Sequence, residues 1–210
     1  MVTIDAMGTQ TNIAKTIREA QADYVLSVKE NQGHLFEDIA TIFAVDQASD
    51  FKFASYECKQ TTNKGHGRID VRECWSTSDP AYLRLIRDWQ HWTGLQSIAL
   101  IKCTRMVDEK ETAYVRYYLS SLSSDAERIL RAVRKHWSIE NQLHLVLDVA
   151  LNEDHSRVRK DQAPENLAVL RHIALNLLKQ EKTAKGGSHA KQLQAAWNQD
   201  YLLKVLASGM

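Results

Sequence analysis

The chain has 210 residues, 44% of them hydrophobic, which is enough to bury the core of one elaborated domain. Lys and Arg number 27 against 26 Asp and Glu, so the formal net charge of +1 excludes nucleic-acid binding through overall basicity and leaves only local clusters. Because no apolar run reaches about 18 residues and no secretion signal leads the chain, we expect a cytoplasmic protein without a membrane partner.

The first 50 residues predict a β-α-β unit. Residues 2–5 form an expected buried strand, residues 9–22 carry apolar side chains at helical spacing, and residues 23–29 return to β-branched strand character. A parallel pair joined by a crossover helix indicates an α/β sheet, whose functional groups usually lie at the carboxyl ends of the strands. Asp5 lies at such an end.

From residue 51 the pattern changes to β. Residues 51–62 and 67–78 predict two antiparallel strands around the turn-forming segment NKGHG. Residues 95–107 and 111–122 predict a second strand pair, with a short helix between the pairs from Tyr82 to Trp92. The other expected helices share apolar side chains at helical spacing. They span residues 34–44, Ser124 to Asp148, 164–181 and 189–206.

Glu140 lies where an apolar helix face is expected. At 100° per residue, Val133 and Leu147 fall about 20° to either side of it. An unpaired carboxylate on such a face costs several kcal/mol, so glutamate is seldom found there without a cation or a hydrogen-bond donor.

The four-residue spacing around Glu140 leaves two interpretations open. His136, Glu140, His144 and Asp148 would share one helical edge, which is typical of a mononuclear metal site. The alternative is an amphipathic boundary at which Glu140 bonds Arg134 or a neighbouring backbone group. Such four-residue sets arise readily in helices, so spacing does not decide between them.

Asp5 supplies a second carboxylate. It could cap the turn that follows its strand. Alternatively, Asp5 and Glu140 could hold a divalent cation together, because Mg²⁺ is bound by one or two carboxylates, with water and substrate phosphate completing its coordination. Phosphoryl transfer is the chemistry that matches this second possibility.

Several blocks together resemble a DDE-type insertion-sequence transposase of the H-repeat-associated (ISAs-type) branch. The resemblance runs from Met1 to about Lys179. Its blocks are VTIDAMGTQ, KTIREAQADYVLSVKENQ, the strand-rich middle with GHGRIDVRE and YYLSSL, and RKHWSIENQLHLVLDVALNEDHSR.

The resemblance implies a ribonuclease-H-like core whose two aspartates and one glutamate bind two Mg²⁺ ions, with Mn²⁺ as a substitute. By motif, Asp5 matches the second aspartate and Glu140 the glutamate, so both would be catalytic metal ligands. The first aspartate has no match in this sequence. We therefore expect a truncated copy that lacks the N-terminal part.

The implied fold class is α/β: a partial ribonuclease-H-like core with a β-rich insertion and C-terminal helices. Residues 1–50 would be the first part of the catalytic core and 51–122 the insertion. Residues 123–182 would hold the catalytic-glutamate helix and the rest of the core, and 183–210 a C-terminal helical tail.

Other polar residues carry weaker signals. Candidates for orienting substrate or ligands, some of them equally interpretable as structural helix-end charges, are Arg134, His136, Asn141, Asp148 and Asp154. Candidate phosphate contacts, for which solvated charge is the alternative, are Lys64, His66, Arg68 and Arg72 in the hairpin, and Arg157, Arg159 and Lys160 after the long helix.

The resemblance implies DNA transposition, with cleavage and strand transfer at insertion-sequence ends. DNA of the transposon ends and target would then be the partner, together with a second copy or a full-length transposase, in a nucleoid-associated cytoplasmic protein. Because the first aspartate is unmatched, enzyme activity stays open. The alternative is an inactive remnant that binds DNA or a full-length transposase.

Overall fold

A computed structural model describes residues 1–49, 51–52, 55–65, 67–108 and 110–209, and excludes the side chains of Glu140 and Asn141. The chain divides into two compact units, Met1–His136 and Trp137–Met210. The division into four parts at residues 50, 122 and 182 stays a prediction.

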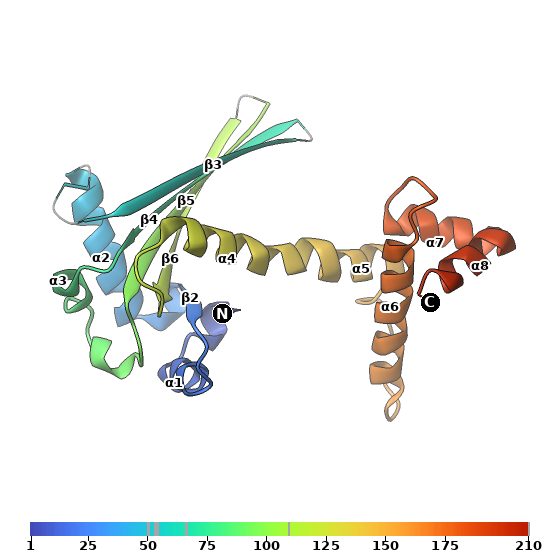
Figure 1. Cartoon of the computed structure of the whole chain (residues 1–210), viewed down its shortest axis with the longest axis horizontal. Helices are drawn as coiled ribbons and strands as arrows, with labels where there is room; N and C mark the ends of the chain where they lie inside the picture. The colour runs from blue at the N-terminus through green and yellow to red at the C-terminus, as the bar shows by residue number, and fades with distance from the viewer. Residues whose placement is uncertain (50, 53–54, 66, 109, 210) are drawn as a thin grey trace. The chain divides into compact units, whose positions relative to one another are not determined.

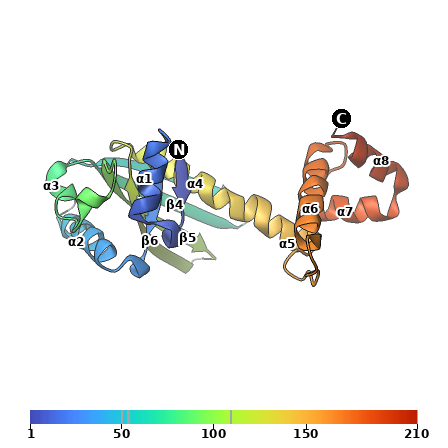
Figure 2. The same cartoon turned by 90° about the horizontal axis from the view of Figure 1, so that it is seen from below.

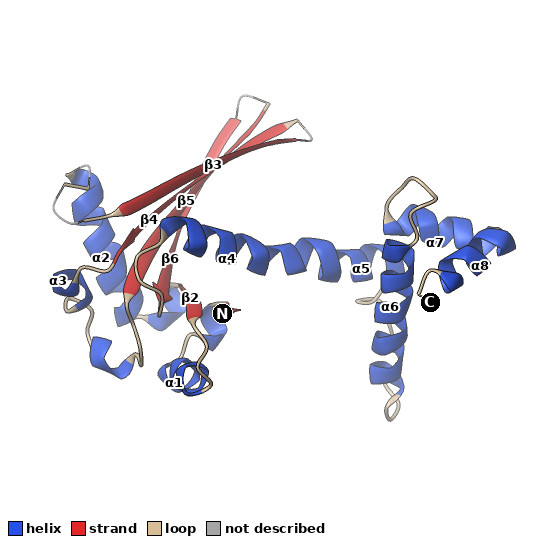
Figure 3. Ribbon diagram, viewed as in Figure 1, coloured by secondary structure: helices blue, strands red, loops and turns tan. Residues whose placement is uncertain are grey.

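The first unit is built on a mixed sheet, six-stranded over the described residues (Figures 1 and 3). The strand order is β1-β2-β6-β5-β4-β3. The β1–β2 pair is parallel, whereas every other neighbouring pair is antiparallel. The strands are β1 Val2–Ile4, β2 Tyr24–Val28, β3 Glu57–Gly65, β4 Arg68–Thr77, β5 Ser97–Val107 and β6 Lys110–Ser120.

The predicted β-α-β unit and both predicted strand pairs are confirmed, and they lie in one sheet because β6 pairs with β2. Every residue of β2 is buried. A strand covered on both faces reads as a continuous apolar run, as Tyr24–Val28 does apart from Ser27. The residues predicted as a β-rich insertion therefore continue the same sheet as the first two strands.

Helices cover both faces of this sheet. On one face, α1 (Thr11–Glu19), α2 (His34–Ala48) and α3 (Pro80–Leu83) pack their apolar side chains against β2, β4, β5 and β6 in one core cluster. In Figure 2, α1 crosses in front of the strands as the connection between β1 and β2. The core of this face includes Ile17, Leu26, Ile39, Phe43, Leu100 and Leu119.

The opposite face carries α4 (Ala126–Ile139). Side chains of successive strand residues alternate between faces, so Lys59 and Asn63 of β3 share one face. Both are bonded from α4: Lys59 Nζ donates to Glu127 Oε2 at 2.9 Å, and Arg134 Nη2 donates to Asn63 Oδ1 at 3.3 Å. These polar contacts hold the helix across the sheet.

A π-helical turn, Glu140–His144, follows α4 and precedes α5 (Leu145–Leu151). The prediction of one regular helix from Ser124 to Asp148 is therefore wrong at this point. A π turn bonds residue i to i+5, so residues beyond Glu140 do not continue in 100° steps. Val133 and Leu147 are both buried, but the 100° spacing that predicted Leu147 on the same face as Glu140 does not apply across this turn.

The second unit also contains α6 (Ala163–Gln180), α7 (Ser188–Trp197) and α8 (Gln199–Ala207). A single helix over residues 189–206 was expected, and this prediction is wrong. Asn198 is extended, with φ −124° and ψ 103°, and its side chain accepts a hydrogen bond from the Tyr201 backbone N–H at 3.0 Å. An asparagine that caps a helix in this way starts a new one.

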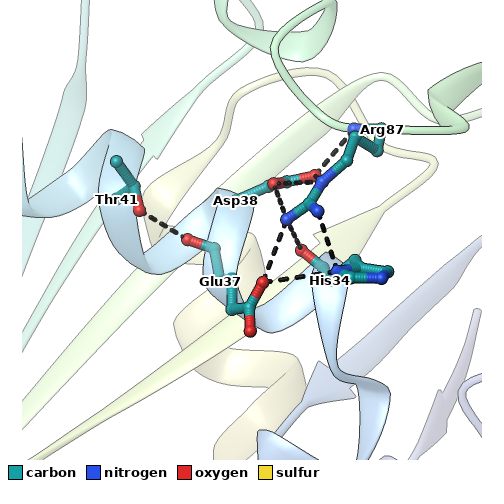
Figure 4. A network of polar contacts seen from close by, with 5 residues as sticks. All are labelled: His34, Glu37, Asp38, Thr41 and Arg87. Carbon is teal, nitrogen blue, oxygen red and sulfur yellow. Dashed lines mark hydrogen bonds and ion pairs between the residues drawn. The ribbon is translucent and has the colours of Figure 1, made fainter.

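A polar network ties the segment after α3 to the start of α2 (Figure 4). Arg87 Nε donates to Asp38 Oδ1 at 2.9 Å, and the Arg87 backbone N–H donates to Asp38 Oδ2 at 2.7 Å. The same guanidinium reaches Glu37 Oε2 at 3.1 Å and holds the pKa of the Glu37 carboxyl below its ordinary value. Nη1 of Arg87 also donates to Nδ1 of His34 at 2.8 Å.

Glu181 is a buried carboxylate in the second unit, 3% exposed. It accepts hydrogen bonds from the backbone N–H and hydroxyl of Thr183 and from the Tyr201 hydroxyl, the last at 2.7 Å. The buried ammonium of Lys191 lies 3.5 Å from it. This cluster joins the ends of α6, α7 and α8.

Across the described residues, no helix is long and apolar enough to cross a membrane.

We predict that the second unit loses stability in acid through Glu181. The Thr183 and Tyr201 hydrogen bonds lower its pKa from 4.5 to about 2. A depressed carboxyl pKa gives stability that is present above about pH 4.5 and lost as the pH falls towards about 2. The protection of the α7 and α8 amides from hydrogen exchange, relative to an unstructured chain at the same pH, should therefore fall across this range.

In Glu181→Gln, the protection of these amides should be lower than in wild type at pH 7, and it should fall less as the pH is lowered. Glu165→Gln, at an exposed position in the first turn of α6, is the control and should behave as wild type. Equal acid dependence in wild type and Glu181→Gln would contradict the assignment.

Candidate functional site

Asp5 directly follows β1, and Lys29 directly follows β2. Because these strands are parallel, with Ile4 opposite Leu26, their carboxyl ends meet at the same edge of the sheet. Lys29 Nζ lies 3.0 Å from Asp5 Oδ1 and donates a hydrogen bond to Oδ2 at 3.2 Å. Lys29 is not among the residues predicted from the sequence, although its place directly after the second parallel strand could have indicated it.

The loop after Asp5 packs closely against neighbouring side chains. Asp5 precedes the 3₁₀ turn Ala6–Gly8 but forms no capping hydrogen bond with its side chain, so the interpretation of Asp5 as a cap is not supported. A Cβ on Gly8 would lie 2.4 Å from Ile4 Cγ2, which explains the glycine in the IDAMG block. The Gln32 side chain donates to the Ala6 carbonyl and joins this turn to the segment after β2.

His136, from the last turn of α4, is the third group near Asp5. Its Nδ1 lies 3.1 Å from Thr3 Oγ1 of β1, which places the imidazole beside the first strand. Burial raises the pKa of Asp5, but the Ala6 backbone amide, the Lys29 ammonium and His136 together outweigh burial and leave that pKa below its ordinary value. The structure thus brings Asp5 and His136, both predicted site residues, into one neighbourhood.

Asp5 has the features of a metal ligand with spare capacity. Its Oδ1 is buried and has no hydrogen bond of acceptable geometry, although the Lys29 ammonium lies 3.0 Å away. The lowered pKa keeps the Asp5 carboxylate ionised at neutral pH, and Oδ1 is an oxygen that a hard cation can bind in place of the ammonium. Among the described residues, no three His, Cys, Asp or Glu side chains gather into a metal-binding group.

The predicted partner of Asp5, the Glu140 carboxylate, lies outside the described side chains, and so does the Asn141 amide. The backbone of Glu140 begins the π turn. Turns of this kind occur frequently at functional sites. The proximity of Asp5 and Glu140 stays a prediction.

The other supporting candidates have structural contacts. Arg134 is bonded to Asn63 of β3, as described above. Asp148 Oδ1 accepts a hydrogen bond from the Asp154 backbone N–H at 3.3 Å, which fits the interpretation of Asp148 as a helix-end charge. Their functional roles stay predictions.

The candidate hairpin contacts include an arginine cluster that sequence analysis found only in part. Asp70, 7% exposed, lies among Arg68, Arg72 and Arg105. The guanidinium nitrogens are 3.5, 3.4 and 2.7 Å from its carboxylate, respectively. Arg105 is opposite Asp70 in the β4–β5 register, which no local pattern reveals. Three cations around one carboxylate leave a local excess of positive charge.

The remaining candidate phosphate contacts are on the surface or outside the described residues. Lys64 is exposed near the end of β3, and His66 lies outside the described residues. Arg157, Arg159 and Lys160 are exposed between α5 and α6. Arg159 Nη1 donates to the Val158 carbonyl at 2.8 Å. Their contact with DNA stays a prediction.

Comparisons with known proteins agree with the motif blocks. A family model described as Transposase DDE domain matches residues 1–177. The chain is 38% identical over 99% of its length to "Putative transposase YncI" of Escherichia coli O157:H7, covering 53% of that protein. It is 36% identical over 99% of its length to "H repeat-associated putative transposase YhhI" of Escherichia coli K12, covering 54% of it.

The chain therefore spans about half the length of the curated relatives that it matches. The family match confirms the predicted resemblance. The family has a ribonuclease-H-like core, which agrees with the mixed sheet and confirms the α/β fold class. The family also uses divalent metal ions. With the family model covering most of its residues, the chain belongs to the Transposase DDE domain family.

Proposed function

We propose that this chain supplies Asp5 and Glu140 as two carboxylate ligands of a Mg²⁺ site for DNA cleavage and strand transfer at insertion-sequence ends. The observation that carries the proposal is Asp5 itself. Its ionised carboxylate lies at the carboxyl end of a parallel strand and keeps one buried oxygen without a hydrogen bond. Mn²⁺, which is similarly hard, would substitute for Mg²⁺.

Bound divalent cations would supply activation of the attacking water or 3′-hydroxyl and stabilisation of the leaving oxygen. The protein's own groups have separate tasks. Lys29 neutralises and orients the Asp5 carboxylate until a divalent cation binds. The imidazole of His136, hydrogen-bonded to Thr3, lies near the same carboxylate, where it can orient ligand or substrate. Arg134 and Asn141 are further candidates for orienting substrate.

DNA would be held through its phosphates. In the arginine cluster around Asp70, the side chains of Arg68, Arg72 and Arg105 are 47%, 21% and 42% exposed, so each keeps some surface that an anion can reach. Phosphate contacts of this kind fix the position of a protein on DNA without reading its sequence. Transposon ends and target DNA are the proposed partners, in a nucleoid-associated protein.

A second candidate function is a non-catalytic protein that binds DNA, or binds a full-length transposase. Two observations favour it: the arginine cluster needs no metal to attract phosphate, and the motif matches assign only two of the three family carboxylates to this sequence. Catalysis therefore separates the two candidates.

We predict that the 210-residue chain does not nick duplex DNA carrying candidate insertion-sequence ends in Mg²⁺. Two-metal catalysis needs all of its carboxylates, because each ion must be fixed against the attacking and the leaving oxygen. A version extended at its N-terminus with the part of a relative that precedes the matched region should nick such DNA, and Asp5→Asn or Glu140→Gln should abolish this activity.

Nicking by the 210-residue chain that disappears in Glu140→Gln would contradict this prediction. Another carboxylate, such as Asp148 or Asp154, would then complete the site. An extended protein that stays inactive although folded would favour the DNA-binding alternative.

We also predict that Lys29 competes with a divalent cation for Asp5. In Lys29→Met, Mn²⁺ should bind about 2- to 5-fold more tightly, the worth of a half-exposed ion pair. Calorimetry or electron paramagnetic resonance of Mn²⁺ measures this directly and needs no catalytic activity. Lys15→Met, on the exposed face of α1, is the matched control.

Asp5→Asn and Glu140→Gln should each weaken Mn²⁺ binding, and the double variant should lose less than the sum of the single losses, because groups that share an ion are coupled. Unchanged binding in Asp5→Asn would remove Asp5 from the metal site. Additive losses would separate Asp5 from Glu140.

For DNA binding, we predict that Lys64→Ala/Arg68→Ala lowers the salt dependence of duplex affinity. Loss of two phosphate contacts should reduce the slope of log K against log salt by about 1.8, at roughly 0.9 per contact. Arg72 and Arg105 are retained so that buried Asp70 keeps its closest partners. Lys15→Ala/Arg84→Ala makes the same change in charge and should leave the slope unchanged; an unchanged slope in both double variants would exclude the hairpin surface.

A further inference from the structure

The edge of β6 is open next to the Asp5 site. Within the described residues, β2 pairs with β6 only from Tyr117 to Ser120, whereas β5 pairs with β6 along its full length. The part of β6 before Tyr117 therefore extends beyond its pairing with β2. The chain leaving β2 passes beside this edge through the 3₁₀ turn Glu30–Gln32.

A cleft of about 720 Å³ lies between these two segments. One wall is the last residue of β2 and the segment after it, Val28 to Asn31, and the other is β6 from Tyr114 to Tyr117, with Phe36 of α2 also in the lining. Lys29 both lines the cleft and contacts Asp5. Lys29 therefore connects the cleft with the carboxylate of the candidate metal site.

The lining combines cations with aromatic rings. The Arg116 guanidinium lies 4.8 Å from the centroid of the Tyr114 ring, and Tyr114 is 43% exposed. Phe36 and Tyr117 contact each other edge to face, with centroids 5.5 Å apart, and give the cleft an aromatic wall. Lys29 and Arg116 outnumber Glu30, the one carboxylate among the lining residues.

We propose that this cleft binds an unpaired DNA segment, with Tyr114 as a stacking platform for a base and Arg116 and Lys29 as contacts for the backbone phosphates. Aromatic rings beside cations are the combination by which proteins bind single strands, since every base has a face that stacks and every nucleotide has a phosphate. The inference deepens the proposed function and rests on it, because it places the strand beside Asp5.

The chemistry of the cleft favours a nucleic-acid strand over an added peptide strand. A peptide that pairs with a sheet edge takes its specificity from pockets for alternate side chains. Here the side chains beside the open edge include Lys29, Glu30 and Arg116, which carry charge where such pockets would be needed. Duplex DNA would present its bases stacked and paired, out of reach of the Tyr114 ring.

The location also fits a reaction that acts on one strand. The cleft and Asp5 share one residue, because the Lys29 ammonium is 3.0 Å from Asp5 Oδ1 while Lys29 also lines the cleft. When a divalent cation takes the place of the ammonium on Asp5, Lys29 becomes available for a phosphate in the cleft.

The test compares the affinity of the protein for a blunt fluorescent duplex with its affinity for the same duplex carrying an unpaired four-nucleotide tail at either the 3′ or the 5′ end. Fluorescence anisotropy is measured in a buffer with chelator, so that no cleavage contributes. Wild type should prefer one tailed duplex over the blunt one by at least about 5-fold, the lower limit expected from stacking of a single base at roughly 1–3 kcal/mol.

The variants assign the preference to the cleft. Tyr114→Ala and Arg116→Ala should bring the ratio close to one, while Tyr114→Phe, which keeps the ring, should retain it. Arg84→Ala is the matched control because Arg84 is an exposed arginine at the end of α3 and outside the cleft lining. Circular dichroism and the melting temperature show whether each variant is folded.

Asp5→Asn keeps failure of this inference distinct from failure of the proposed function. It should lose Mn²⁺ binding yet retain the preference for the tailed duplex. Equal affinity of wild type for blunt and tailed DNA, or a preference that survives in folded Tyr114→Ala, would overturn the proposal.

A cross-linking measurement covers the case in which Tyr114→Ala does not fold. A tail that carries 5-iodouracil is irradiated with the wild-type protein, and the adducts are mapped by mass spectrometry. Adducts on peptides containing Tyr114, Tyr117 or Phe36 are expected. Adducts confined to the second unit would overturn the proposal.

Discussion

The parallel pairing of β1 with β2 is the constraint on which the site depends. It places the residues that follow the two strands, Asp5 and Lys29, at the same edge, and it requires the crossover that α1 provides. The other side of β2 pairs with β6 and so connects this edge to the long antiparallel strands. With every residue of β2 buried, the burial of each large apolar side chain in it contributes about 1.5–3 kcal/mol to folding.

Three carboxylates with cationic partners differ in their surroundings, and these surroundings determine whether each is structural or can bind a ligand. Glu181 is enclosed by donors from Thr183 and Tyr201, which leaves it no capacity for a ligand. Asp70 is surrounded by arginines, so it organises positive charge on the surface rather than offering an anion. Asp5 differs because one oxygen keeps no hydrogen bond and its side chain is half-exposed. That combination is what a metal ligand that also meets substrate requires.

The open edge of β6 follows from the difference in strand length at the same junction. β2 has five residues and β6 has eleven, so β6 must extend beyond its partner. Unpaired strand edges are usually protected because they template unwanted pairing. Here the segment after β2 and the charged side chains of Lys29, Glu30 and Arg116 lie beside the edge. A charged cleft is therefore both a protection against strand pairing and a surface suited to a polyanion.

Elements whose signal is local could be predicted from the order of the residues alone. Alternation over residues 57–77 and 97–120 specified the two hairpins, helical spacing specified α1 and α2, and the IDAMG and HWSIEN blocks carried the family and the choice of Asp5. The breaks were harder to predict: Asn198 splits a helix by turning extended and capping the next one, and the π turn at Glu140 keeps the composition of a regular helix.

Which groups meet depends on how the strands and helices are arranged in space. Lys29 reaches Asp5 because two parallel strands end at one edge, Arg105 reaches Asp70 because β4 and β5 are in that register, and the cleft exists because β6 is longer than β2. Side-chain periodicity along a chain reports which face of its own element a residue occupies. It contains no information on strand order or register, and these fix the neighbours of a charge.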